Sequence, residues 1–390
     1  MKRETIQFFK IGKEDGQKFL KLIKEKFKDQ DVIDKKYKVV KENDYILFPL
    51  VDDVQLLNKL EKHLEYKFEY QIVTQKAIPN PKFGYKSLEK LLINEIPEEI
   101  LNLIPKSYDI IGEIAIFEFD KFGEYERKAL GPFKKKIARA IEIANKHVKT
   151  VYEKKSEIKG EHRLRELALI YGQNKSETIH KENKCQFKLD VMYTFFTPRL
   201  VFERRRIAST NIKANEIIVD MFAGVGPISI QLAKNNEVTI YSFDINTVAY
   251  NYLKENIKLN KLKGKIIPDN IDIKDLINPS NKLGSLLKSN VDRIIMNLPE
   301  NSLEYIDVAC FLMKKNGGII HNYQFCEKPN QIEKAIEDFK KKLNNYNWQI
   351  EKILNAKKVK AYSPKADLVV IDLYINQINN KNERIKSSDL

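Results

Sequence analysis

The C-terminal half of the chain alternates short apolar runs with amphipathic stretches. Ile217–Val219 and Val238–Asp244 are apolar runs of strand length, and Ala249–Leu259 carries apolar residues at helical spacing. Strands that alternate with helices typically form a mostly parallel, doubly wound sheet. The pattern therefore predicts an α/β domain with a Rossmann-like sheet. Its other strands are predicted at Lys265–Pro268, Asp292–Asn297 and Gly317–Tyr323, with a closing antiparallel pair at Trp348–Val359 and Asp367–Ile375.

The N-terminal half mixes both kinds of pattern. Asp15–Phe27 has an apolar helical stripe, Tyr45–Val51 reads as a strand, and Ala77–Gly84 is rich in proline and glycine, as linkers are. Beyond this linker, Tyr108–Phe119 predicts two strands around a bend and Pro132–Ala144 predicts a helix. We therefore predict α+β N-terminal and middle domains ahead of the α/β domain. The predicted domains are residues 1–76, 85–200 and 201–378, with a disordered polar tail at 379–390.

A glycine turn joins the first strand of the α/β domain to the helix that follows it. The turn is Asp220–Pro227, with glycines at Gly224 and Gly226. A dinucleotide site needs a third glycine, but Ser229 stands there, and Pro227 removes an amide that a phosphate would use. The acid that opens the turn suits a cationic ligand. These features favour S-adenosylmethionine over a dinucleotide, with an ordinary tight turn as the alternative.

Polar residues stand at the ends of four successive predicted strands: Asp220, Asp244, Asp272 and Asn297. Ligands of doubly wound sheets bind at the carboxyl ends of the strands. A carboxylate after the second strand, as at Asp244, can bind two ribose hydroxyls. The four positions together predict a nucleoside cofactor site.

Composition adds a second partner. The 390 residues carry a formal net charge of +15, which suggests a polyanionic partner such as nucleic acid; a lysine-rich proteome is the alternative explanation. The three cysteines lack metal-ligand spacing, so no metal is expected and the thiols read as reduced. No apolar run has the length of a membrane span, and Met1–Thr5 does not begin a signal peptide. A cytoplasmic protein is expected.

Several motifs together resemble the archaeal and eukaryotic tRNA guanine N1-methyltransferases, which act on guanosine 37 beside the anticodon. The resemblance implies a class I methyltransferase domain, S-adenosylmethionine as cofactor, and a monomer that binds the anticodon loop and the elbow of tRNA. The matching segments are Ser107–Gly112, Lys155–Glu166, Ile179–Asn183, Phe196–Leu200, Glu203–Arg204, Asp220–Pro227, Asp244–Asn246 and Asn297–Pro299.

The resemblance also implies roles for individual residues. Glu203 matches the proposed general base, and Arg163 matches an arginine that contacts the target guanine. Where archaeal members carry a tyrosine near the donor methyl group, this chain has Phe195, which keeps the ring without the hydroxyl. The other matches are Asn297 and Pro299 of an N-L-P motif beside donor and base, the cofactor-contacting acids Asp244 and Asp272, and Phe222 and Arg199 in cofactor-lining segments.

The chemistry is consistent with those roles. N1 of guanine carries a proton at neutral pH, so a carboxylate such as Glu203 is needed to accept it. Negative charge then develops toward O6, where a guanidinium such as Arg163 stabilises it. On spacing alone, Glu203 with Arg204–Arg206 also fits a solvated ion-pair lattice, and Arg163 fits a partner of Glu161 or Glu166.

Three other functions stay open at this stage. They are a bifunctional enzyme that also methylates a tricyclic wyosine intermediate, an aminocarboxypropyl transferase of the same pathway, and a non-catalytic tRNA-binding protein. Glu300–Asn301, directly after the N-L-P motif, and Phe195 are the departures that could mark a subtype.

Overall fold

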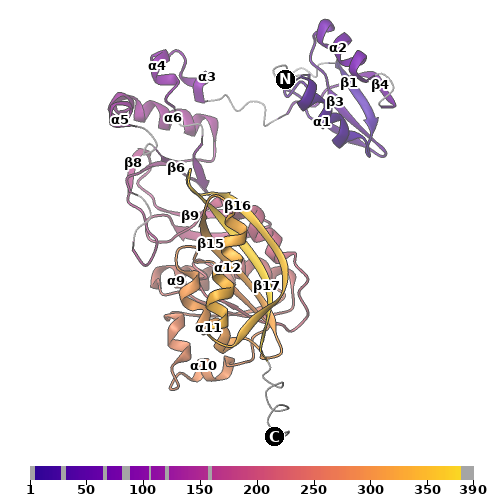
Figure 1. The fold of residues 1–390 in the computed structure, drawn as a ribbon. Helices are drawn as coiled ribbons and strands as arrows, with labels where there is room; N and C mark the ends of the chain where they lie inside the picture. Colours follow the sequence, from indigo (N-terminus) through magenta and orange to yellow (C-terminus); the bar gives the residue numbers. More distant parts are fainter. Residues whose placement is uncertain are drawn as a thin grey trace. The chain divides into compact units, whose positions relative to one another are not determined.

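The structure is a computed structural model that describes residues 5–27, 32–64, 68–80, 88–104, 107–118, 123–156 and 160–378. Contacts divide the chain into two compact units, Met1–Leu101 and Asn102–Leu390, and each is described by itself (Figure 1). Residues 88–101, expected to open the middle domain, group with the first unit. The predicted tail and residues 81–84 of the predicted linker lie outside the described residues.

The first unit contains a small antiparallel sheet and, among its described residues, four helices. Its strand order is β2-β3-β1-β4. The helix predicted at Asp15–Phe27 and the strand predicted at Tyr45–Val51 are confirmed. Phe9 and Phe19 stack with ring centroids 4.3 Å apart, and Phe48 and Leu60 complete a buried core. The elements are β1 (Thr5–Gly12), α1 (Gly16–Lys26), β2 (Val40–Glu42), β3 (Tyr45–Pro49), α2 (Val54–Leu64), β4 (Tyr70–Lys76), α3 (Leu88–Leu92) and α4 (Glu98–Leu101).

The second unit begins with a mixed sheet in the order β5-β6-β7-β8 and a hairpin of β9 and β10. The two predicted strands around a bend are present, and the predicted helix buries Ile137 and Ile141. The elements are β5 (Asp109–Ile111), β6 (Ile114–Glu118), α5 (Glu124–Leu130), the 3-10 turn η1 (Gly131–Phe133), α6 (Lys134–Ala144), β7 (Thr150–Lys154), β8 (Leu167–Gly172), β9 (Glu177–Glu182) and β10 (Cys185–Asp190).

A seven-stranded sheet dominates the second unit, in the order β13-β12-β11-β14-β15-β17-β16. The first five strands of that order run parallel, and β17 and β16 close the sheet as an antiparallel pair, as predicted. Its strands are β11 (Ile217–Asp220), β12 (Thr239–Phe243), β13 (Lys265–Asp269), β14 (Arg293–Met296), β15 (Gly318–Glu327), β16 (Trp348–Ala361) and β17 (Ala366–Gln377).

Helices cover both faces of this sheet, so neighbouring residues of one strand enter different cores. Ile218 packs in one hydrophobic cluster and Val219 in the other, and Ile295 and Ile294 divide in the same way. The helical segments are η2 (Pro198–Leu200), α7 (Val201–Ala208), α8 (Pro227–Asn235), α9 (Thr247–Leu259), η3 (Ile273–Ile277), α10 (Lys282–Leu287), η4 (Ser302–Tyr305), α11 (Ile306–Leu312) and α12 (Gln331–Asn344). Within the described ranges, no helix has the length and apolar character needed to cross a membrane.

Candidate active site

A cavity of about 830 Å³ opens where the parallel strands end. The strand order reverses between β11 and β14, which is where doubly wound sheets bind their ligands. The structure brings all four predicted strand-end residues to this cavity, and most of the other predicted site residues line it too. The predicted residues in the lining are Arg163, Arg199, Asp220, Phe222, Gly224, Asp244, Asp272, Asn297 and Pro299.

The two glycines of the turn have different tasks. Gly224 has a φ of +56°, and a Cβ built there would meet no atom of the described residues within 4 Å, so its open side leaves room for a ligand. Its amide donates a hydrogen bond of 2.7 Å to Asp244 Oδ2. Gly226, at φ +86°, does not line the cavity; a Cβ there would lie 2.3 Å from Leu253 Cδ1. Gly226 therefore allows α8 and α9 to pack closely.

Asp220 is a buried acid with one unused oxygen. Its side chain ends β11, where the residue is 1% exposed, and its Oδ2 accepts a hydrogen bond of 2.7 Å from the Ser229 hydroxyl. Its Oδ1 has no hydrogen-bond partner among the residues that the structure describes. Burial raises the pKa of Asp220 to about 6. A buried carboxylate beside a cavity is stabilised by a cationic ligand.

These residues fit S-adenosylmethionine. Its ammonium group would donate a hydrogen bond to the unpaired Asp220 oxygen, the carboxylate would also stabilise the charge of its sulfonium group, and its ribose would meet Asp244 after β12. Phe222 and Tyr305 form an aromatic wall, with ring centroids 4.9 Å apart in an edge-to-face contact. The donor set therefore suits a nucleoside with a positively charged tail.

Arg163 faces the same cavity with unused donors. Its side chain is 13% exposed, and its Nη2 lies 3.4 Å from Glu300 Oε1. Its Nε and Nη1 are buried and make no hydrogen bond with any described residue. The residue has φ +54°, a left-handed conformation that is costly for arginine. The alternative pairing with Glu161 or Glu166 is wrong, because the turn points the guanidinium toward Glu300.

Phe195 supports this arginine. The Arg163 guanidinium carbon lies 5.2 Å from the centroid of the Phe195 ring, in a cation–π contact. The ring lines the cavity. The phenylalanine therefore retains a packing role that needs no hydroxyl.

Glu203, the predicted general base, lies on α7 and does not line the cavity. It is 5% exposed. Arg206 donates to it at distances down to 2.6 Å, Lys357 Nζ lies 3.0 Å from Oε2, and the Tyr323 hydroxyl donates to Oε1 at 3.0 Å. Burial acts to raise the pKa of Glu203, but the hydrogen bonds and charges of Arg206 and Lys357 outweigh burial and lower it. Glu203 is therefore held as a carboxylate.

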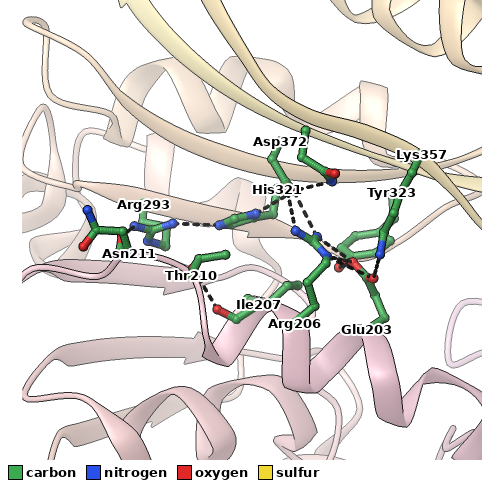
Figure 2. A network of polar contacts seen from close by, with 11 residues as sticks. Glu203, Arg206, Ile207, Thr210, Asn211, Arg293, His321, Tyr323, Lys357 and Asp372 are labelled. Carbon is green, nitrogen blue, oxygen red and sulfur yellow. Dashed lines mark hydrogen bonds and ion pairs between the residues drawn. The ribbon is translucent and has the colours of Figure 1, made fainter. Parts of the chain in front are cut away.

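Figure 2 shows that Glu203 stands at one end of a longer polar network. Arg206 also pairs with Asp372, and the Asp372 carboxylate accepts a hydrogen bond of 2.7 Å from His321 Nδ1. His321 Nε2 accepts from Arg293 Nη1 at 2.9 Å. With one ring nitrogen donating and the other accepting, His321 is neutral, and its burial lowers its pKa accordingly.

The alternative of a solvated ion-pair lattice at residues 203–206 is wrong for its first two members. Arg204 is 4% exposed and donates two hydrogen bonds of 2.6 Å to Glu182. Its guanidinium also lies 5.0 Å from the centroid of Phe196. The helix is short and packs between the hairpin and the sheet, so these charges are paired inside the protein.

Some cavity residues carried no motif that would have marked them. Lys360 and Tyr362 line the cavity from the end of β16 and the turn after it. Their stretch reads as an ordinary strand end, and only the antiparallel pairing with β17 brings it to the site. Glu300 also lines the cavity; its place after the N-L-P motif was the only sequence signal for it.

The sheet order, the glycine turn and the strand-end cavity together define a class I methyltransferase fold. The chain matches two family models. Residues 178–351 match the family described as "TRM5/TYW2 methyltransferase domain", and residues 88–175 match the one described as "TYW2 N-terminal domain". The chain belongs to this TRM5/TYW2 methyltransferase family.

Individual relatives match over nearly the whole chain. The tRNA (guanine(37)-N(1))-methyltransferase Trm5b of Methanocaldococcus jannaschii is 35% identical over 94% of this chain and 98% of its own length. The enzyme of the same name from Pyrococcus abyssi is 34% identical over 91% of this chain and 96% of its own. A solved complex of aTrm5 with tRNALeu has a TM-score of 0.60 and 33% identity, covering 95% of this chain and 99% of that one.

Proposed function

We propose that the protein transfers a methyl group from S-adenosylmethionine to N1 of guanosine 37 in tRNA. The observation that carries the proposal is that one cavity is lined by two buried side chains with atoms that lack hydrogen-bond partners among the described residues. They are the Asp220 carboxylate and the Arg163 guanidinium. The first suits a cationic donor molecule, and the second suits an acceptor oxygen on a second molecule. Relatives that are similar over nearly their full length are named for this activity.

The strand-end residues hold the donor molecule. Asp220 binds its positively charged tail, and Asp244 binds its ribose. The open side of Gly224 lets the molecule approach the backbone of the turn. S-adenosylmethionine supplies the methyl group: its carbon–sulfur bond breaks as the carbon–N1 bond forms, and the sulfur keeps the electron pair. Asn297 and Pro299 line the cavity at the end of β14, where the target base meets the donor.

Arg163 and Glu203 carry the proton chemistry. Arg163 donates to O6 of the guanine and stabilises the negative charge that develops there. Glu203 accepts the N1 proton. In the free protein Glu203 is paired with Arg206 and Lys357 and does not line the cavity. Acceptance of the N1 proton therefore requires its side chain to turn toward the cavity when the tRNA binds.

A cationic cluster beside the cavity binds the RNA backbone. Arg165 and Lys360 line the cavity. Arg199, which the resemblance places in a cofactor-lining segment, lines it too and is paired with Asp109 at 2.7 Å. Burial lowers the pKa of Lys360, and the neighbouring arginines Arg199, Arg165 and Arg163 lower it further, against the opposing effect of Asp109. Phosphate groups relieve such mutual repulsion. The target base leaves its stack to reach the cavity, while residues 1–76 bind the elbow of the tRNA. The enzyme acts as a monomer in the cytoplasm.

Replacing Lys360 with glutamine is expected to flatten the salt dependence of tRNA binding. Each phosphate contact contributes about 0.7–0.9 to the slope of log affinity against log salt concentration, so the slope should fall by about that amount. Filter binding at several salt concentrations measures it. Lys352→Gln is the matched control, since Lys352 lies on the same strand outside the cavity lining. An unchanged slope for Lys360→Gln would place Lys360 away from the RNA backbone.

The proposed function is tested with the purified protein, S-adenosylmethionine and tRNA transcripts that carry guanosine or adenosine at position 37. Mass spectrometry of digested product should show N1-methylguanosine with the first transcript and no methyl group with the second. Tricyclic wyosine intermediates are tested in parallel. Transfer of an aminocarboxypropyl group, or methylation of the tricyclic base alone, would contradict the proposal.

A further inference from the structure

Glu300 is an acidic residue that lines the cavity beside Arg163. It follows Pro299 directly, and its side chain is 44% exposed, so a ligand in the cavity can reach it. Its Oε1 lies 3.4 Å from Arg163 Nη2. The Pro299 carbonyl next to it already accepts a hydrogen bond of 3.1 Å from the Phe325 amide. Glu300 therefore places a carboxylate, which accepts hydrogen bonds, beside the donors of Arg163.

The pair matches one edge of one base. A guanidinium only donates hydrogen bonds and an ionised carboxylate only accepts them. The Watson–Crick edge of guanine presents an acceptor at O6 and a donor at the 2-amino group, with N1 between them. Adenine has a donor in place of O6 and no 2-amino group. An arginine and a glutamate side by side therefore complement guanine and mismatch adenine.

We propose that Glu300 accepts a hydrogen bond from the 2-amino group of the target guanosine while Arg163 donates to O6. Glu300 is then a specificity-determining residue, and the two side chains bracket N1 and leave it open to the methyl donor. The inference rests on the proposed function, because it needs guanosine as the substrate. In the free protein the two side chains lie 3.4 Å apart. When guanosine binds, the Watson–Crick edge of the base enters between them and separates them.

Inosine tests the inference directly, because it is guanosine without the 2-amino group. The steady-state ratio kcat/KM is measured on transcripts with guanosine 37 or inosine 37, for the wild type and for Glu300→Ala. The wild type should prefer guanosine about tenfold, the low end for a hydrogen bond to a charged group, since Glu300 is partly exposed. Glu300→Ala should lose this tenfold on guanosine, keep the wild-type value on inosine, and so show no preference.

Two further variants sharpen the experiment. Glu300→Gln keeps an acceptor oxygen and should retain part of the preference. Glu304→Ala removes an exposed carboxylate four residues along that does not line the cavity, and should behave as the wild type on both transcripts. Thermal unfolding of each variant checks that the fold is kept.

The outcomes separate the two proposals. If Glu300→Ala prefers guanosine as strongly as the wild type does, the inference is wrong. If Glu300→Ala loses activity equally on both transcripts, Glu300 acts on N1 or on Arg163 and not on the 2-amino group, which also overturns it. If the wild type methylates neither transcript at N1, the proposed function itself fails.

Discussion

Replacing Glu203 with glutamine is expected to slow single-turnover methyl transfer by about 10²- to 10⁴-fold, the range that a positioned proton acceptor contributes. Glutamine keeps the size and one acceptor oxygen of the side chain but cannot take the N1 proton. The rate is measured at saturating S-adenosylmethionine and tRNA, so that weaker binding does not enter. The affinity for S-adenosylmethionine should stay near the wild-type value, because Glu203 does not line the cavity.

The same substitution also affects the fold. Glu203 is buried between Arg206 and Lys357, and a neutral side chain leaves part of their charge unpaired. Glu216→Gln is the matched control: Glu216 pairs with the buried Arg293 at 2.9 Å, at the opposite end of the polar network. Both variants should unfold at lower temperature, but only Glu203→Gln should lose the methyl-transfer step.

The methyl-transfer rate and the unfolding temperature of Glu203→Gln together decide whether Glu203 serves catalysis or only the fold. If Glu203→Gln turns over at the wild-type single-turnover rate and shows only the loss of stability, the carboxylate serves the fold alone. The proton acceptor would then have to be sought among the acids that line the cavity. A slow Glu203→Gln enzyme with a normal Glu216→Gln enzyme supports the proposed role.

The large sheet could be predicted from the sequence because its central strands are buried on both faces. Such strands appear as continuous apolar runs, as in β11 and β14, and runs of this kind need no tertiary information. The strand β9, Glu177–Glu182, was not predicted, because its sequence lacks an apolar run. Apart from one threonine and one isoleucine, its six residues are two glutamates, a histidine and a lysine. Pairing with β10 and the ion pair between Glu182 and Arg204 fix it in place.

The candidate site divides in the same way. Asp220, Asp244 and Asn297 could be placed together because parallel strands end at one edge of a sheet. The contacts of Arg163 with Glu300 and of Glu203 with Lys357 join residues far apart in the chain. No local pattern contains such a contact. The left-handed backbone of Arg163, which turns its side chain toward the cavity, is also invisible to a motif that names only the residue type.

Asp220→Asn is expected to weaken S-adenosylmethionine binding by about 10- to 100-fold, the value of a hydrogen bond between charged groups. In the wild type the affinity should also depend on pH. A cationic ligand binds the ionised carboxylate, and burial raises the pKa of Asp220 to about 6. The affinity should therefore be nearly constant above about pH 7, be about half as large at pH 6, and fall below pH 6 toward the value of the asparagine variant. Calorimetry from pH 5 to 8 measures both effects, and the asparagine variant should show no such dependence.

Stability should change in the opposite direction, which distinguishes a ligand-binding acid from a structural one. A carboxyl group whose pKa in the folded protein lies above its ordinary value of 3.8 stabilises the fold fully only below that value. This contribution is lost as the pH rises through 6. Without ligand, Asp220→Asn should therefore unfold at a higher temperature than the wild type at pH 8 and lose this advantage toward pH 4. A variant that is less stable at pH 8 and binds S-adenosylmethionine normally would show that Asp220 supports the turn and not the ligand.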